Sequence, residues 1–397
     1  MTVPNPLPLS GVTVVSLEQA VAAPFATRQL ADLGARVIKI ERPGVGDFAR
    51  RYDESVHGQS SYFVWLNRSK ESLTLDVRSP AGRELLERLL GQADVFVQNL
   101  APDSARRLGL DTARLSDRHP RLISCGISGY GSDGPWSDRK AYDMLIQCET
   151  GLVSITGSPD EPTRVGISVA DIAAGMYAFT GILTALYERA ATGVARAVEV
   201  SLFEALAEWM GSPAYYSQYG GRPPARIGTA HATIAPYGLF HTRDGGALLL
   251  SIQHEREWAA FCEIVLADPE LATDPRFDSV AARVANRAAV DKIVADRLST
   301  LDIEPATALL DRANVANARY NSMTDFLAHP VLAERDRWRD VDTPGGPIRA
   351  LLPPANLSGV RPRMDAVPAV GEHTDAILRE LGCDDATITD LRRDSTI

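Results

Sequence analysis

Asp171 is the residue of this sequence whose type and position are best suited to covalent chemistry. It follows the apolar run at 165–170 and stands where a long helical pattern begins, over 172–189. An aspartate at such a place commonly caps the helix, because its carboxylate accepts hydrogen bonds from the first backbone N–H groups. The helix dipole would also keep the carboxylate ionised, as a nucleophilic aspartate must be. The pattern therefore predicts either a helix cap or a nucleophile.

Basic and amide side chains follow the predicted strands of the first half. Arg42 comes directly after the second predicted strand and Asn99 after the fourth. Ligands of open parallel sheets bind outside the carboxyl ends of the strands. Each of these side chains alone is more often a solvated surface residue, but together they suit a phosphate-rich adenine nucleotide such as coenzyme A (CoA). The other cations close by in the sequence are Lys70, Arg78, Arg106 and Arg107.

Two glycine-rich motifs favour structural turns over catalysis. The letters GVGDFA at 44–49 imitate a dinucleotide fingerprint, but they follow Pro43 and precede a loop-like segment instead of opening a helix. The letters GISG at 126–129 miss the spacing of a hydrolase nucleophile elbow by one residue. We therefore expect neither a nicotinamide cofactor nor a hydrolase serine. The seven histidines are dispersed and no H-E-x-x-H occurs, so no metal is expected either.

Short apolar runs alternate with helical patterns through the first half, which is typical of parallel strands joined by crossover helices. One helix has Pro24 in its first turn and ends near Gly34, and another is capped by Ser79 and ends at Gly91. The pattern predicts an α/β fold with a doubly wound, mostly parallel, Rossmann-like sheet. Its strands are expected at 12–17, 36–40, 73–77, 94–97, 122–127 and 196–202.

The later part of the chain predicts a second, smaller α+β domain, since 397 residues exceed one typical core. Residues 213–236 are rich in Pro, Gly and Tyr and are interpreted as a linker. A strand at 247–252 and charged helices over 255–310 follow. The expected domains are a large part at 1–205, a linker at 206–228, a small domain at 229–335, and a C-terminal segment at 336–397.

The composition is that of an ordinary globular enzyme, with 45% hydrophobic and 23% charged residues. A net charge of -10 argues against nucleic acid as the main partner. The four cysteines form no C-x-x-C pair, so neither disulfides nor a zinc site is expected. No run approaches the roughly 20 apolar residues that a membrane span requires. We expect a cytoplasmic protein without a membrane partner.

A series of short motifs along nearly the whole chain resembles the class III CoA-transferase family. This family includes formyl-CoA and carnitine CoA-transferases and the related methylacyl-CoA racemases. Any one motif is weak, but all of them in the family's order make a specific signal. They are LSGV at 9–12, GARVIKIERPG at 34–44, GD at 46–47, GL at 109–110 after Asn99, GYG at 129–131, GP at 134–135, DI at 171–172 and GEHT at 371–374.

The resemblance implies a transferase that moves CoA between carboxylic acids, with acyl-CoA as co-substrate and Asp171 as the catalytic aspartate. By the same matching, Tyr142 falls beside the active site. Arg226 and His231 are candidates for binding the second carboxylate of a diacid through charge-assisted hydrogen bonds. The positions that match the family's CoA contacts are Arg42, Lys70, Leu75, Arg78, Asn99, Arg107 and Lys140.

Two departures from the formyl-CoA enzymes and a likeness to another branch of the family narrow the expected substrate class. Val21 stands where the formyl-CoA enzymes carry a glutamine, and their run of consecutive active-site glycines is absent, which argues against formyl-CoA. A later set of motifs is similar to the branch that acts on small dicarboxylic acids such as mesaconate, itaconate, malate or citramalate. These motifs are ANAR at 316–319, HP at 329–330, RW at 337–338 and PGG at 344–346.

Two other functions compete with CoA transfer. The racemase branch carries a His-Asp pair where this chain has Tyr142 and Asp143, and the missing histidine removes a base that racemisation needs. A CoA-binding relative without turnover would be favoured if Asp171 were dispensable. The family also implies a homodimer of two interlocked chains, in which the N-terminal sheet of each chain is completed by its own C-terminal segment.

Overall fold

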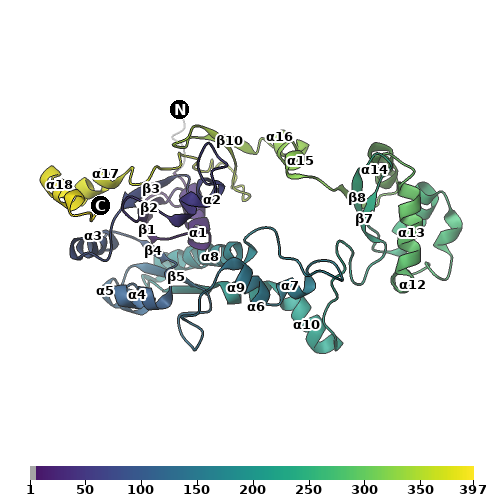
Figure 1. The fold of residues 1–397 in the computed structure, drawn as a ribbon, viewed down its shortest axis with the longest axis horizontal. Coiled ribbons are helices and arrows are strands. Elements are labelled where there is room, and N and C mark those ends of the chain that lie inside the picture. Colours follow the sequence, from purple (N-terminus) through teal and green to yellow (C-terminus); the bar gives the residue numbers. More distant parts are fainter. Residues whose placement is uncertain (1–5) are drawn as a thin grey trace. The chain divides into compact units, whose positions relative to one another are not determined.

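The chain folds into two compact units (Figure 1). The computed structural model describes residues 6–397. The larger unit joins the segment that ends at Leu152 with Val165–Ser212 and Arg335–Ile397, and the smaller unit joins Val153–Arg164 with Pro213–Glu334. Each unit has a hydrophobic core of its own.

A six-stranded parallel sheet forms the centre of the larger unit, in the order β3-β2-β1-β4-β5-β6. It confirms the parallel sheet and the α/β class that the sequence predicts. The order reverses between β1 and β4, and ligands of open sheets bind at such a reversal, outside the carboxyl ends of the strands. The strands are β1 (Thr13–Leu17), β2 (Arg36–Glu41), β3 (Lys70–Thr74), β4 (Val95–Gln98), β5 (Ile123–Ser128) and β6 (Val198–Ser201).

Strand β3 is displaced from its predicted place. The sequence predicts a strand at 73–77, whereas the observed strand starts at the polar residue Lys70. Lys70 lies opposite Val37 of β2, and its ammonium group donates to the Glu18 carboxylate at 2.7 Å. A carboxylate partner makes a buried lysine tolerable, so a polar residue can begin an interior strand here.

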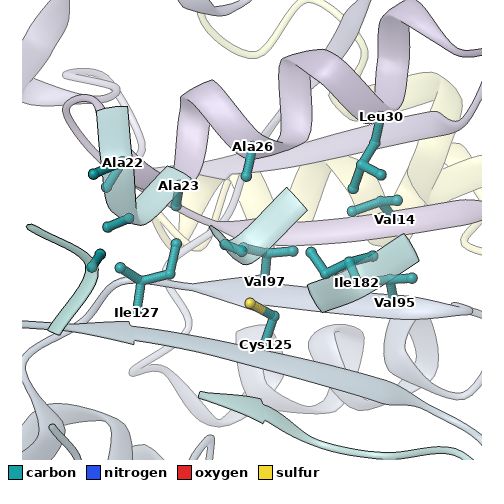
Figure 2. Packing of buried hydrophobic residues seen from close by; sticks show 14 of the residues in the cluster. Val14, Ala22, Ala23, Ala26, Leu30, Val95, Val97, Cys125, Ile127 and Ile182 are labelled. Atoms are coloured by element: carbon teal, nitrogen blue, oxygen red, sulfur yellow. The ribbon is translucent and has the colours of Figure 1, made fainter. Parts of the chain in front are cut away.

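Helices α1 (Ala22–Asp32) and α8 (Val169–Thr192) cover one face of this sheet. Figure 2 shows Leu30 of α1 and Ile182 of α8 close to Val14 of β1. Successive strand residues point to opposite faces of a sheet. Strand residues such as Val15 and Phe96 therefore belong to a second hydrophobic cluster on the other face. The sheet is therefore a buried middle layer with helices on both faces.

Gly175 sets how closely α8 approaches α1. A Cβ atom at this position would lie 2.6 Å from the Ala22 carbonyl oxygen and 3.1 Å from the Phe25 side chain. Glycine is the residue that permits this backbone approach, because it has no Cβ. The first turn of α1 and the second turn of α8 are consequently in direct contact.

The C-terminal segment packs against the β3 side of the larger unit. The hydroxyl of Thr374, at the start of α17 (Thr374–Glu380), accepts a hydrogen bond from the Thr74 backbone at 3.0 Å. Other elements of this segment and of the larger unit are η1 (Phe48–Arg51), α2 (Ser61–Leu66), α3 (Pro80–Leu90), α4 (Pro102–Leu108), α5 (Thr112–Arg118), α6 (Asp143–Glu149), α9 (Leu202–Trp209), β10 (Trp338–Val341), β11 (Ile348–Leu351) and α18 (Asp385–Arg393).

The smaller unit contains a three-stranded antiparallel sheet with helices packed around it. Part of the segment interpreted as a linker is helical, because α10 (Gly211–Gly220) follows α9 almost directly. The remaining elements are α7 (Leu152–Ile155), β7 (Tyr237–His241), β8 (Ala247–Ser251), α11 (Glu255–Phe261), η2 (Cys262–Leu266), η3 (Pro269–Ala272), α12 (Val280–Ala285), α13 (Arg287–Leu298), α14 (Ile303–Arg312), β9 (Ala316–Arg319), α15 (Met323–Leu327) and α16 (Pro330–Glu334).

Helix α8 combines unusual length with an apolar surface. Over residues 6–397 it is the one helix whose length and composition would suffice to cross a membrane, and 39% of its most apolar window is buried. Core helices of globular proteins meet the same criteria. Its exposed side chains include Tyr177 and Tyr187.

Candidate active site

Asp171 is the third residue of α8. The helix begins at Val169, with Ser168 at the capping position, so the prediction that Asp171 caps the helix is wrong. The apolar run before Asp171 contributes its last residues to the helix, which places the aspartate inside the first turn. Its side chain is partly buried there.

The first turn of α8 is capped from another helix, by the carboxylate of Asp143 at the start of α6. Asp143 Oδ1 accepts hydrogen bonds from the backbone N–H of Ala170 at 2.7 Å and of Asp171 at 3.3 Å. Its Oδ2 accepts from the Gln147 amide at 2.7 Å, and the Gln147 oxygen accepts from Val165 N–H at 2.9 Å. Asp143 and Gln147 thus fix the chain on both sides of the helix start.

The Asp171 carboxylate is left without a hydrogen-bond donor in the part of the chain that the structure describes. Burial raises the pKa of its carboxyl to about 7, and the negative charge of Asp143 adds to the rise. The expectation of a fully ionised carboxylate therefore needs correction. The helix N–H groups that would favour the ionised form already donate to Asp143.

The phenol of Tyr52 lies near this carboxyl group in the larger unit. Burial raises the pKa of the Tyr52 phenol to about 12, and the charges of Asp47 and Asp171 contribute, as does Tyr142. The Tyr52 ring packs edge-on against Tyr62 with ring centres 5.5 Å apart. Tyr142, which directly precedes Asp143, is 67% exposed. Tyr52 is therefore close to both Asp171 and the predicted residue Tyr142.

Asn99 lies at the reversal point of the sheet. Its Oδ1 accepts a hydrogen bond from Gln19 N–H at 2.9 Å, and its Nδ2 donates to the Gln19 carbonyl at 2.8 Å. Gln19 follows β1 and Asn99 follows β4, so this pair of bonds ties the carboxyl ends of the two central strands together.

Two of the predicted CoA contacts, Arg42 and Arg78, are exposed and gather around Asp76. Burial by itself would raise the pKa of Asp76, but hydrogen bonds from Arg78 and the charge of Arg42 lower it. Arg42 follows the carboxyl end of β2 in the chain, and Arg78 follows that of β3. They form a cationic surface at the edge of the sheet where phosphates could bind.

Two other predicted contacts are buried and cannot present their side chains to a ligand in this structure. The Lys70 ammonium donates to Glu18 at 2.7 Å and to the Pro24 carbonyl at 3.1 Å, and burial lowers its pKa to about 8. Leu75 lies in the core beneath α3. The interpretation of Lys70 as a free cation for phosphate is thus not supported, because Glu18 already neutralises it.

Arg107 and Lys140 are exposed on the larger unit. Arg107 donates to the Ser104 hydroxyl at 3.0 Å. The neighbouring Arg106 is held by Asp103 and Asp138, at 2.9 and 3.0 Å. A cavity of about 440 Å³ opens beside Arg106 at the carboxyl ends of β4, β5 and β6. Its lining contains Arg106 together with several acidic side chains, and neither Arg107 nor Lys140 is part of it.

Arg226 and His231 belong to the smaller unit. The three guanidinium nitrogens of Arg226 donate to the carbonyls of Ser154, Ser158 and Pro159, at 3.0 to 3.2 Å. Arg226 therefore ties two segments of this unit together, and the structure does not favour it as a free cation. His231 is exposed and its ring stacks on Tyr237, with centres 5.2 Å apart.

No group of three or more His, Cys, Asp or Glu side chains is arranged to hold a metal ion among the described residues. The segment at 44–49 leads from β2 into the short helix η1 and not into a crossover helix. Asp47 caps this short helix by accepting from Ala49 N–H at 2.9 Å.

Comparison with protein families identifies the chain. A model described as CoA-transferase family III matches residues 9–374. The chain belongs to this family. It is accordingly a class III CoA-transferase, an enzyme that transfers CoA between carboxylic acids and uses acyl-CoA substrates.

Known CoA-transferases and a solved structure are similar to this transferase over most of its length. Succinyl-CoA:glutarate CoA-transferase of Mus musculus is 32% identical over 390 residues, which are 94% of this chain and 86% of the relative. Acetyl-CoA:oxalate CoA-transferase of Acetobacter aceti is 35% identical over 355 residues, 86% of this chain and 89% of the relative. The crystal structure of a CaiB/BaiF family protein from Brucella suis superimposes with a TM-score of 0.85 at 34% identity, covering 95% of this chain and 100% of that one.

Sequence reasoning missed two residues that the structure places at the candidate site. Asp143 was weighed only as half of a racemase pair, although its position after Tyr142 marked it as near the site. Tyr52 carries no local signal, because its nearness to Asp171 arises from the packing of the η1 region. Neither contact follows from spacing along the chain.

The raised pKa of Asp171 predicts a pH-dependent stability. The unfolded chain ionises this carboxyl above about pH 4, whereas the folded transferase keeps the proton up to about pH 7. Folded protein thus binds more protons in this window, so the contribution of Asp171 to the free energy of unfolding falls as pH rises from about 4 to about 7. Asp171→Asn removes this loss and should raise Tm by several degrees at pH 8, and by clearly less at pH 5.

Thermal unfolding at both pH values measures the effect. Asp117→Asn is the matched control, because it neutralises an exposed carboxyl on α5. An equal change in Tm at pH 5 and pH 8 for Asp171→Asn would contradict the raised pKa.

Proposed function

We propose that this transferase carries CoA on Asp171, with a small dicarboxylic acid as donor or acceptor. The observation that supports this most is a partly buried carboxylate that no described neighbour hydrogen-bonds, in the first turn of a helix capped from elsewhere. A nucleophile must be free of strong donors, since each hydrogen bond to the carboxylate stabilises the ground state. The pKa near 7 leaves a substantial ionised fraction at neutral pH.

The first half-reaction converts the donor thioester into an enzyme thioester. The Asp171 carboxylate attacks the donor carbonyl, the C–S bond breaks, and CoA thiolate leaves behind a mixed anhydride. The thiolate then attacks the aspartyl carbonyl and breaks the anhydride C–O bond. The donor acid departs with one oxygen from Asp171, and CoA remains on the enzyme as a β-aspartyl thioester.

The second half-reaction runs the same steps in reverse with the acceptor. The acceptor carboxylate attacks the aspartyl thioester, forms a second anhydride and expels the thiolate. The thiolate then attacks the acceptor carbonyl, which gives the new acyl-CoA and restores the Asp171 carboxylate with one acceptor oxygen. Thioester and anhydride have comparable reactivity, so positioning can organise the exchange without further chemistry.

The exposed cations of the larger unit are the proposed contacts of the CoA phosphates. They are Arg42, Arg78, Arg107 and Lys140. Arg42 and Arg78 follow the carboxyl ends of β2 and β3, and exposed cations suit a large anionic ligand whose charged part stays near solvent. The diacid preference rests on the names of the relatives, which use glutarate and oxalate.

A panel of acids tests the reaction and its substrates. The purified protein is incubated with succinyl-CoA or acetyl-CoA and with glutarate, oxalate, mesaconate, citramalate or a monocarboxylate of equal chain length. New thioesters are followed by mass spectrometry. We expect transfer to at least one dicarboxylate, with the matched monocarboxylate at least about tenfold poorer, because it lacks a charge-assisted hydrogen bond.

Asp171→Asn is the decisive variant, because it keeps the shape of the side chain but removes the nucleophile. The expected loss is at least about 10³-fold, the scale on which removal of a covalent nucleophile acts. Ordinary transfer by Asp171→Asn would refute the covalent mechanism. Exchange of the α-proton of an acyl-CoA without any acceptor would show racemisation instead.

We propose further that two copies of the chain form a homodimer. Helix α8 exposes Tyr177 and Tyr187, and a groove of about 630 Å³ runs beside the edge strand β6 between α8 and α9. A long apolar helix with an exposed face and an unpaired strand edge would be covered by a second copy. Light scattering at assay concentration should give twice the mass of one chain, and the mass of a single chain would contradict the proposal.

A further inference from the structure

The turn between β1 and α1 has a conformation that its sequence does not favour. Ala20 has φ +60°, a left-handed backbone conformation that residues other than glycine, asparagine and aspartate rarely adopt. Such a residue persists only where its surroundings hold it in place, and functional sites are common places for it. Val21, the next residue, leads into the first turn of α1.

Polar groups hold each residue of this turn. Gln19 is bound through both its N–H and its carbonyl by the side chain of Asn99. The N–H of Ala20 donates to Asp47 Oδ1 at 3.3 Å. Glu18, just before them, accepts from Thr27 at 2.6 Å and is bound to two buried lysines. The left-handed residue is therefore fixed from three directions.

Asp47 is itself fixed by a buried ion pair. Its Oδ2 accepts from the Lys39 ammonium at 2.8 Å, and both side chains have an exposed fraction of 0%. Lys39 also lies 3.4 Å from Glu18, so the same ammonium connects the two carboxylates on either side of the turn. A buried ion pair adds little net stability, but loss of one partner leaves the other charge buried and uncompensated, so the pair is costly to break.

The turn lies next to Asp171. Gly175 of α8 touches Ala22 at the start of α1, and Asp171 is one helical turn before Gly175. Ile182 of α8 lies at the Leu30 end of α1 in Figure 2, whereas Gly175 approaches Ala22, so the two helices run in the same direction. Asp171 therefore lies beyond the N-terminal end of α1, next to the turn that contains Ala20 and Val21. The phenol of Tyr52 senses the charges of both Asp47 and Asp171, which agrees with this placement.

We propose that Asp47 is a positioning residue for CoA transfer, acting through the Ala20 N–H on the turn that faces Asp171. The proposal rests on the proposed role of Asp171 as nucleophile. A thioester that reacts with the Asp171 carboxylate must lie against this turn, because the turn is its neighbour at the start of α1. The buried pair of Lys39 and Asp47 keeps that surface in one conformation, so that the reacting carbonyl meets the carboxylate at bonding distance.

The variant Asp47→Asn distinguishes a positioning role of Asp47 from a purely structural role of a buried side chain. If the amide oxygen stays with Lys39, the amide NH₂ faces the N–H groups of Ala20 and Ala49, which then have no acceptor. The isosteric variant should lower kcat about ten- to hundredfold, because a misplacement of about 1 Å costs up to about 10²-fold. The KM values for donor and acceptor should change little, since Asp47 touches neither.

Ala20→Val tests the same turn without altering the ion cluster. A β-branched residue is a genuine outlier at φ +60°, so the turn must move. Its kcat should fall as in Asp47→Asn, again with small changes in KM. This variant decides the matter if Asp47→Asn does not fold.

Asp32→Asn is the matched control at the opposite end of α1. Asp32 is buried and bound to Arg28 at 2.6 Å and to Arg68 at 2.8 Å, so its loss also disrupts a buried ion cluster. It should lower Tm but leave kcat near the wild-type value when assayed well below Tm.

Several results would overturn the proposal. Wild-type kcat in Ala20→Val, or in folded Asp47→Asn, would do so, and so would an equal loss of kcat in Asp32→Asn at comparable Tm. Asp171→Asn is assayed alongside to separate the two hypotheses. If Asp171→Asn is inactive while the turn variants are fully active, the positioning role alone fails; if Asp171→Asn is active, the covalent mechanism fails and the positioning role falls with it.

Discussion

The hydrogen bonds from the first turn of α8 to Asp143 are the interaction on which the candidate site depends. Because Asp143 satisfies these backbone donors from α6, Asp171 has no capping role and keeps its carboxylate unbound. Burial raises the pKa of the Asp171 carboxyl to about 7, and the negative charge of the neighbouring Asp143 adds to the rise. The sequence offers capping and catalysis as alternatives for Asp171; in the structure Asp143 does the capping, which leaves Asp171 for the proposed catalysis.

The parallel sheet supplies the frame for this arrangement. Its order reverses between β1 and β4, and Asn99 ties the ends of these strands together through Gln19. Gly175 lets the second turn of α8 lie against the start of α1, which follows β1 in the chain. Buried charges beneath the turn would be costly unless fully paired, and Lys39 and Lys70 are paired. Burying these charged pairs costs stability, and we attribute their presence to a turn that must keep one backbone conformation.

The sequence predicts the frame better than the contacts. Apolar runs place five of the six strands within two residues at both ends, because most of these strands are buried and leave a local apolar pattern. The exception is β3, whose first residue, Lys70, is buried only because Glu18 lies beside it. The roles of Asp143 and Arg226 likewise depend on partners distant in sequence. Family motifs locate Asp171 but do not reveal what binds each neighbouring side chain.

Transfer of oxygen from the acceptor to Asp171 tests the central claim most directly. The enzyme is given donor acyl-CoA and an acceptor acid labelled with oxygen-18 in its carboxylates, and the peptide that contains Asp171 is then examined by mass spectrometry. An anhydride formed with the acceptor must leave one acceptor oxygen on the aspartate, so the account predicts heavy oxygen in that peptide and in no other aspartyl peptide. Formation of the new acyl-CoA without label in the Asp171 peptide would contradict it.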